Sequence, residues 1–414
     1  MNEHTILNES RFPIVGWAGP SGDVLRPDVM SGMTEAGFTV SHSSVAGDAH
    51  AVSRALDIAA TAGIRLLLVH PAWHVSDDYR LDDARKDEVR TLVNAVKDHP
   101  GLYGYHLRDE PRYALLPLLA EVHTFMRELD PYHALYINHY PPIEGWGAPT
   151  AEAFWRRYID IAQPQFLSYD HYALTVATAA EVSAQAGQPN VFPAEKLIVK
   201  PDYFECLELL RNLSLAYRVP FWAFTCSVRH GPYPTPTEGH IRFQLMNNLA
   251  YGALGLQYFT YAHDGAMVRQ DGSTTPTWDI ARRVNRDVHL LAPIMRRLRN
   301  IGVFRTGQLW SGTRALGRSH LAPLVACDGD PVTIGFFQDD SDLLHLMVVN
   351  GNPCQWSRIT LKVNVSKDKL YVFDYGDGLF RELWPPDPHN QMVSLAPGEG
   401  RLLKVGGEGL GQNF

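Results

Sequence analysis

The segment 101–111 reads GLYGYHLRDEP, an apolar and aromatic stretch that runs into two adjacent carboxylates, Asp109 and Glu110, and a proline. In a barrel of parallel strands, side chains at the C-terminal end of a strand reach the mouth of the active site. Partial burial there raises the pKa of a carboxyl, so that it can donate a proton at neutral pH. A structural alternative is that one of the two carboxylates caps a helix with Pro111 in its first turn.

Polar or aromatic side chains also end most of the other strand-like runs of this chain. They are Trp17, His42, His70, Trp73, His139, Tyr140, Asp170, His171, Tyr172, Arg229, His230, His263 and Asp264. Aromatic rings stack on the C–H faces of a sugar while polar groups pair with its hydroxyls, so the set predicts a carbohydrate site. We expect Trp222 and Tyr261, which lie within the last two runs, to line the same site.

Two further carboxylates at strand ends are candidates for a second chemical role. Asp170 is the leading one, and its alternative role is to bind a substrate hydroxyl or a tyrosine. Asp264 is a weaker candidate, because Asp264 and Gly265 also form an ordinary turn pair. The histidines could instead bind a metal ion for a hydrolase or lyase. Because the sequence has no H-x-H pair and no H-E-x-x-H spacing, we expect neither a metal nor another cofactor.

Eight β-rich runs alternate with helix-like segments up to about residue 300, which is the pattern of a parallel sheet. The runs are 12–17, 38–42, 64–70, 101–110, 134–139, 166–170, 219–226 and 255–261. Their number and length predict a (β/α)8 barrel over residues 1–302. Beyond it, short runs such as 333–337, 344–349 and 371–373 are separated by Gly, Asp and Pro turns. They predict a C-terminal, antiparallel, sandwich-like all-β domain over residues 303–414.

The composition is that of an ordinary globular protein, with 45% hydrophobic and 20% charged residues among 414. A net charge of −8 argues against nucleic acid or an anionic membrane as a partner. The chain has no apolar run of membrane-spanning length, and residues 1–12 have no signal-peptide pattern. Four scattered cysteines suit a reducing compartment, so we expect a cytoplasmic protein. No heptad pattern indicates an oligomeric state.

Three segments resemble retaining TIM-barrel glycoside hydrolases, the clan that contains many β-galactosidases. Residues 103–111 are similar to the acid/base strand of that clan, and residues 241–261 to its last helix-to-strand passage. Residues 395–403 resemble the final strand of the β-domain that such enzymes often carry. The resemblance implies a glycosidase that acts on a neutral glycoside, with Glu110 as the general acid/base.

The chain departs from that clan at the seventh strand, where the nucleophilic glutamate is replaced by Thr225-Cys226-Ser227-Val228. The nearest glutamate is Glu238, in a pattern that predicts a capping box with Thr235 as the N-cap. We therefore expect a structural role for Glu238, and its alternative role is to contact the sugar. We therefore expect Glu110 to pair with Asp170, with Asp109 as a neighbour that tunes Glu110, and the choice between retention and inversion stays open. The missing nucleophile supports an alternative, a carbohydrate-binding barrel without catalysis.

Overall fold

A computed structural model describes residues 11–184, 187–188, 190–317, 324–363, 369–383 and 390–406. Contacts divide these residues into two compact units. The barrel unit contains residues 11–171, 209–229 and 255–285, and the second unit contains residues 172–208, 230–254 and 286–406. The expected domain boundary at residue 302 stays a prediction.

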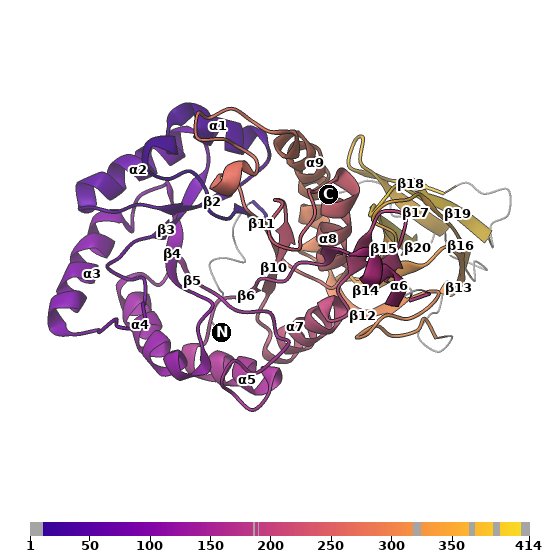
Figure 1. Cartoon of the computed structure of the whole chain (residues 1–414), viewed down its shortest axis with the longest axis horizontal. Helices are drawn as coiled ribbons and strands as arrows, with labels where there is room; N and C mark the ends of the chain where they lie inside the picture. Colours follow the sequence, from indigo (N-terminus) through magenta and orange to yellow (C-terminus); the bar gives the residue numbers. More distant parts are fainter. Residues whose placement is uncertain are drawn as a thin grey trace. The chain divides into compact units, whose positions relative to one another are not determined.

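Eight parallel strands form the sheet of the barrel unit (Figure 1). They are β1 (Ile14–Gly16), β2 (Val40–Ser44), β3 (Arg65–Val69), β4 (Leu102–Asp109), β5 (Ala134–Asn138), β6 (Leu167–Tyr169), β10 (Phe221–Cys226) and β11 (Gly255–Phe259). Each strand pairs with the next one in this order except β5 with β6, and β11 pairs with β1. A parallel bridge between His139 and Tyr169 joins the two remaining edges, β5 and β6, so the sheet closes into a ring. The predicted (β/α)8 barrel is confirmed.

Helices separate the strands in chain order, and α1 to α5 lie outside the ring of strands in Figure 1. They are α1 (Pro27–Glu35), α2 (Ala49–Thr61), α3 (Asp83–Val96), α4 (Leu116–Leu129), α5 (Ala151–Ala162), α7 (Tyr203–Tyr217), α8 (Glu238–Ala250) and α9 (Pro276–Met295). Short 3-10 turns occur at η1 (Gly22–Val24), η2 (Tyr113–Leu115) and η3 (His263–Gly265). Asp48, Asp82 and Thr150 cap α2, α3 and α5 by accepting backbone N–H groups. The described helices include none that is long and apolar enough to cross a bilayer.

Most strands of the barrel are apolar, as expected of strands with both faces buried, whereas β2 (VSHSS) is mainly polar. Leu66, Leu67 and Leu68 of β3 are fully buried, and every residue of β10 is buried. Such strands are typical of a parallel sheet that is covered by helices.

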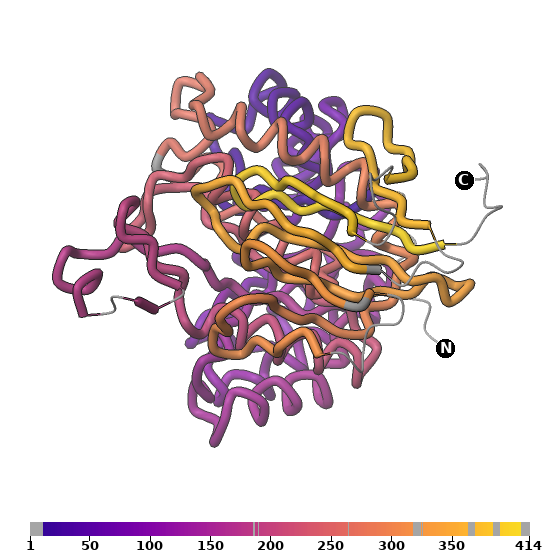
Figure 2. Tube along the Cα trace, turned by 90° about the vertical axis from the view of Figure 1, so that its right-hand side faces the viewer, coloured from indigo at the N-terminus to yellow at the C-terminus, as the bar shows by residue number. Residues whose placement is uncertain are grey.

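The second unit contains two antiparallel sheets that share one hydrophobic core. In Figure 2 the C-terminal strands, orange to yellow, run side by side. One sheet contains β12 (Arg299–Arg305), β14 (Val332–Gln338), β15 (Leu344–Asn350), β20 (Gly400–Gly406), β17 (Lys369–Asp374) and β18 (Leu379–Glu382), and the other β13 (Leu324–Gly329), β16 (Ser357–Val363) and β19 (Asn390–Leu395). The predicted antiparallel β-structure beyond residue 300 is confirmed.

The long connection after β6 also belongs to the second unit. It contains α6 (Ala179–Ala184) and a small antiparallel sheet of β7 (Leu174–Val176), β9 (Leu197–Val199) and β8 (Val191–Phe192). Ala177, Val191 and Ile198 pack together beneath this sheet.

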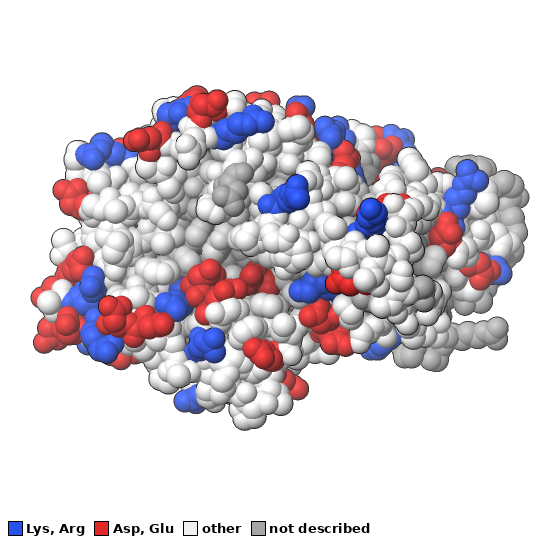
Figure 3. Space-filling view, in the orientation of Figure 1, with Lys and Arg blue, Asp and Glu red and all other residues white. Residues whose placement is uncertain are grey.

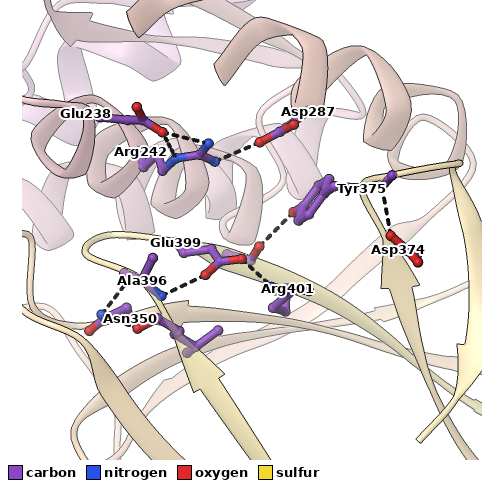
Figure 4. A network of polar contacts seen from close by, with 12 residues as sticks. Glu238, Arg242, Asp287, Asn350, Asp374, Tyr375, Ala396, Glu399 and Arg401 are labelled. Carbon is purple, nitrogen blue, oxygen red and sulfur yellow. Dashed lines mark hydrogen bonds and ion pairs between the residues drawn. The ribbon is translucent and has the colours of Figure 1, made fainter. Parts of the chain in front are cut away.

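The start of α8 corrects one prediction. Thr237 is the N-cap, not Thr235, and its side chain accepts a hydrogen bond from His240 N–H. Glu238 is therefore the first helical residue, and it pairs with Arg242 at 2.9 Å instead of reaching back to the cap. Arg242 also pairs with Asp287 at 2.9 Å, as Figure 4 shows.

Candidate active site

Glu110 lies directly after β4, at the C-terminal end of the barrel strands. Its φ angle is +47°, a conformation that is uncommon outside glycine, and its backbone N–H donates to Asn138 O on β5 at 2.8 Å. Non-glycine residues in such conformations cluster at functional sites. The backbone at Glu110 therefore turns out of the strand while it remains attached to the neighbouring strand.

The carboxyls of Glu110 and Asp170 are hydrogen-bonded to each other. Asp170 directly follows β6, and its N–H donates to His139 O at 3.1 Å. Two carboxyls can form this bond only when one of them carries a proton. In Figure 3 acidic side chains, drawn red, gather over the ends of β5 and β6.

Burial and mutual repulsion keep protons on this pair. Burial, with the negative charge of Asp109 as the next cause, raises the pKa of Glu110 to about 7, although the hydrogen bond with Asp170 opposes the change. Burial followed by the charge of Glu110 raises the pKa of Asp170 well above its ordinary value. Burial also raises the pKa of Asp109. A carboxyl that titrates near pH 7 is suited to donate a proton at neutral pH.

Asn138, the last residue of β5, holds two of the carboxylates. Its side-chain nitrogen Nδ2 donates to Asp109 Oδ1 at 3.0 Å and to Asp170 Oδ1 at 3.2 Å. The amide oxygen of Asn138 accepts a hydrogen bond from Ser168 Oγ at 2.9 Å. One amide therefore fixes Asp109 and Asp170 relative to each other. Asn138 is not among the residues that the strand-end pattern indicates.

The network continues into the interior of the barrel. Gln257 Nε2 donates to Ser168 Oγ at 2.9 Å, and Tyr136 O–H donates to Gln257 Oε1 at 2.5 Å. Ser168, Gln257 and Tyr136 come from β6, β11 and β5 and are buried. The carboxylate cluster thus rests on a polar layer that is satisfied by its own hydrogen bonds.

Two of the predicted residues, Trp17 and His42, lie in the barrel interior together with His106. The rings of Trp17 and His42 stack at 3.8 Å, and His42 Nε2 lies 3.0 Å from His106 Nδ1. Ala18 N–H donates to His42 Nδ1 at 3.4 Å, which places the proton of His42 on Nε2. Burial lowers the pKa of His42 to about 3, so this ring is neutral.

Tyr140 lies two residues after the end of β5, with a side chain that is half-buried. It stacks on Trp146 at 4.0 Å and 17°. Burial and the negative charge of Glu110 raise the pKa of the Tyr140 hydroxyl. Trp146 is a further aromatic residue that the sequence analysis did not select. The two rings offer an aromatic surface for the apolar face of a sugar.

A cavity of about 1130 Å³ opens at the C-terminal ends of β2 and β3. His70 lines it together with His74, Asp78, Tyr79 and Arg80. His70 is also held by the backbone, since its Nε2 lies 2.9 Å from Gly47 O and its Nδ1 accepts Ala72 N–H at 3.1 Å.

Several predicted residues pack in the core of the barrel unit instead of joining the carboxylates. His139 lies against Trp155 and Tyr158 of α5, with ring centroids 4.7 and 4.2 Å away. Trp73 and Trp222 are fully buried. Trp73 Nε1 donates to Leu68 O, Trp222 stacks on Phe166 at 4.0 Å, and Tyr261 packs against Phe38 at 5.1 Å.

The remaining candidates are distributed over both units. His171 is buried, and His263 is exposed in η3. The side chain of Asp264 lies outside the described part of the chain. Tyr172, His230 and Glu238 belong to the second unit, where the first two contact the ring of Tyr233. Among the described residues, no three His, Cys, Asp or Glu side chains are grouped so that they could hold a metal ion.

The end of β10 carries no carboxylate, because the sequence has neither Asp nor Glu between Phe221 and Thr237. The thiol of Cys226 donates to Val228 O at 3.2 Å, and burial raises its pKa to about 11. Ser227 Oγ donates to Thr260 O at 3.1 Å. Both side chains therefore donate hydrogen bonds to backbone carbonyl oxygens.

No protein-family model matches the sequence, and no curated protein sequence matches it. Similar solved structures include a β-galactosidase from the psychrophilic Marinomonas ef1, with 12% identity over 69% of this chain and 62% of that chain, at a TM-score of 0.49. Others are a glucosidase from Croceicoccus marinus (10% identity, 96% of both chains, TM-score 0.45) and a glycoside hydrolase family 5 mannosidase from Rhizomucor miehei (12%, 69% of this chain and 94% of that chain, 0.45). This chain thus spans less than two thirds of the β-galactosidase.

Proposed function

We propose that the chain is a glycoside hydrolase in which Glu110 donates the proton to the leaving oxygen. The observation that carries the proposal is the hydrogen bond between the carboxyls of Glu110 and Asp170 at the mouth of the barrel. Together with burial, it supports the presence of a protonated carboxyl at the end of the barrel where the active sites of such barrels lie. General acid catalysis of this kind contributes about 10²- to 10⁴-fold to a reaction rate.

Asp170 serves this proposal best as the residue that holds Glu110. In glycosidases that use two catalytic carboxyls, these groups stand about 5–5.5 Å apart for retention and about 6.5–9.5 Å apart for inversion. Glu110 and Asp170 are instead hydrogen-bonded directly to each other. Asp170 therefore positions the side chain and proton of Glu110, and Asp109 raises the pKa of Glu110 through its charge.

The substrate that fits this site is a carbohydrate. Tyr140 and Trp146 supply an aromatic surface, and the carboxylates supply hydrogen-bonding groups for sugar hydroxyls. The net charge of −8 favours a neutral sugar over an anionic one.

The test is a screen of chromogenic glycosides against the wild type and Glu110→Gln. We expect the variant to lose about 10²-fold or more of kcat/KM with leaving groups that need protonation. Glu152→Gln is the matched control, since Glu152 is an exposed helical glutamate that pairs with Arg156. Equal activity of the Glu110 variant and the wild type would remove Glu110 from the reaction. Activity that disappears with a chelator would favour a metal-dependent enzyme instead.

A carbohydrate-binding barrel without catalysis is the second candidate function, and the missing carboxylate at the end of β10 favours it. It predicts sugar binding that survives Glu110→Gln, with no turnover by either protein. Calorimetric titration of both proteins with the sugars of the screen separates the two functions.

A further inference from the structure

The three carboxylates at the mouth of the barrel form one connected cluster. Glu110 is hydrogen-bonded to Asp170, and Asp109 shares the amide nitrogen of Asn138 with Asp170. A carboxylate nucleophile must instead approach the anomeric carbon from the side of the sugar opposite to the departing oxygen. Asp170 is joined to the proposed acid, so it does not occupy that opposite side.

No other group at the neighbouring strand end replaces such a nucleophile. Cys226 is a protonated thiol that donates to Val228 O, with its pKa raised to about 11 by burial. The hydroxyl of Ser227 donates to Thr260 O. Glu238 is paired with Arg242 in the second unit.

Asp109 has one oxygen to offer a substrate. Its Oδ1 accepts the hydrogen bond from Asn138, and within the described residues no hydrogen bond reaches Oδ2. Asp109 is half-buried, and it directly precedes Glu110. It can therefore accept an N–H from a substrate that is held within reach of the proton donor.

We infer that the substrate is a 2-acetamido-2-deoxy glycoside whose own amide oxygen displaces the leaving group, with Asp109 bound to the amide N–H. This inference rests on the proposed function. Substrate-assisted hydrolysis is an established exception to the use of two catalytic carboxyls. Because the acetamido group attacks from behind, it must be trans to the leaving group, which selects β-linked sugars of the gluco and galacto series.

The reaction has two balanced steps. In the first, Glu110 donates its proton to the glycosidic oxygen, the bond between that oxygen and C1 breaks, and the acetamido oxygen bonds to C1. The products are the free alcohol and an oxazolinium ion, whose N–H and positive charge face the Asp109 carboxylate. In the second, water bonds to C1 and gives a proton to Glu110. The bond between C1 and the acetamido oxygen breaks, and the sugar is released with its configuration retained.

Paired 4-nitrophenyl substrates test the inference. We compare the β-glucoside and β-galactoside with their 2-acetamido-2-deoxy counterparts, and then replace N-acetyl by mono-, di- and trifluoroacetyl. Fluorine makes the amide oxygen a weaker nucleophile, so kcat/KM is expected to fall stepwise, by roughly tenfold or more over the series. A methyl thiazoline fused to the sugar, which mimics the bicyclic intermediate, is expected to bind about 10²-fold or more tighter than the substrate.

Asp109→Asn supplies the residue-level test. It is expected to lower kcat on the 2-acetamido substrate and to weaken binding of the thiazoline, because the amide cannot balance the positive charge. Asp87→Asn is the matched control, since Asp87 is an exposed helical aspartate that pairs with Arg90. Unchanged thiazoline binding in Asp109→Asn would overturn the assignment of Asp109.

The failure of this inference is distinguishable from the failure of the proposed function. If only 2-hydroxy glycosides are hydrolysed and Glu110→Gln abolishes that hydrolysis, the substrate class is wrong while the glycosidase stands. A rate that does not respond to fluorination also overturns the inference. If neither type of glycoside distinguishes the wild type from Glu110→Gln, the proposed function itself fails.

Discussion

Glu110 can donate a proton only while it still holds one, so the activity must depend on pH in a defined direction. Burial and the charge of Asp109 raise the pKa of Glu110 to about 7. We expect kcat/KM to be high below this pH and to fall about tenfold per pH unit above it. A pH profile of kcat/KM on the best substrate of the screen measures this limb.

Asp109→Asn checks the origin of the raised pKa. Removing the negative charge of Asp109 lowers the pKa of Glu110, so the alkaline limb is expected to move to lower pH. Asp87→Asn should leave the limb in place, since that carboxylate is exposed and paired with Arg90. A limb that stays at the same pH in both variants would show that Asp109 does not tune Glu110.

His139 is expected to lower the stability of the fold, because neither of its ring nitrogens has a hydrogen-bond partner within the described residues. It is fully buried between aromatic rings of α5. His139→Leu removes the two polar atoms and keeps a side chain of similar size. We expect the free energy of unfolding at pH 7 to rise by about 1 kcal/mol in urea titrations.

His70→Leu is the matched comparison for His139. Both ring nitrogens of His70 are engaged, one by Gly47 O and the other by Ala72 N–H. Its replacement leaves these backbone groups without partners, so we expect a loss of about 1–3 kcal/mol. If both variants change stability by the same amount, the difference in hydrogen bonding does not matter.

At the scale of the element, β4 must stay close to β5 for Glu110 to be held. An added Cβ at Gly104 would meet Ala134 O at 2.2 Å and Ala134 Cβ at 2.5 Å, both on β5. Gly104→Ala therefore forces the strands apart and is expected to lower the free energy of unfolding by about 1–3 kcal/mol. We also expect kcat to fall, because Glu110 follows the same strand.

Gly32→Ala is the control for Gly104→Ala. Gly32 lies inside α1, where an added Cβ would meet nothing within 4 Å. Alanine is the better helix former, so this variant is expected to gain about 0.5–1 kcal/mol. Urea unfolding of both variants measures the contrast, and a stable, fully active Gly104→Ala would mean that β4 and β5 separate without consequence.

The sequence was sufficient to predict the barrel elements because most strands are short apolar runs and most helices are longer amphipathic segments, although β2 is mainly polar and α8 is buried nearly all round. The sequence was less informative about the site because side chains alternate between the two faces of a strand. A shift of one residue therefore turns a side chain to the opposite face. Asn138 points to the carboxylates, whereas its neighbour His139 faces α5. The strand-end pattern indicates His139 as the sugar contact instead. Strict alternation from Tyr136, an interior residue of the same strand, could have indicated Asn138.

Contacts between residues far apart in the sequence determine which side chains are buried and which lie in the site, and no single motif reveals them. Trp73 and Trp222 were predicted as sugar contacts because of their type, yet both are buried by residues far away in the sequence. The hydrogen bond between Glu110 and Asp170 joins residues on two strands that do not pair directly. The position of both residues at strand ends predicts that they act together, although no spacing in the sequence encodes their contact.

For the whole molecule, buried histidines make stability depend on acid. Burial lowers the pKa of His42, His123 and His139 to about 3 and that of His240 to about 4. In the unfolded chain these groups take up protons below about pH 6.5, while in the folded chain they do not. The free energy of unfolding therefore falls as the pH falls below 6.5.

Raised carboxyl pKa values act in the opposite direction. Glu110, Asp109 and Asp170 bind protons in the folded chain at a pH where the unfolded chain has released them, so acidification stabilises the fold through these three groups. They are outnumbered by seven histidines whose pKa is lowered by burial, the four above together with His74, His106 and His345, so we expect a net loss of stability. The urea concentration at the midpoint of unfolding should decrease as the pH is lowered from 6.5 to 4.5.

His139→Leu separates this cause from general acid sensitivity. The variant lacks one of the histidines that take up a proton on unfolding, so its urea midpoint should depend less steeply on pH than that of the wild type. His50→Gln is the control, because His50 is exposed and its replacement should leave the slope unchanged. A wild-type midpoint that stays constant or rises on acidification would mean that the carboxylate cluster, rather than the histidines, governs the response of the molecule to acid.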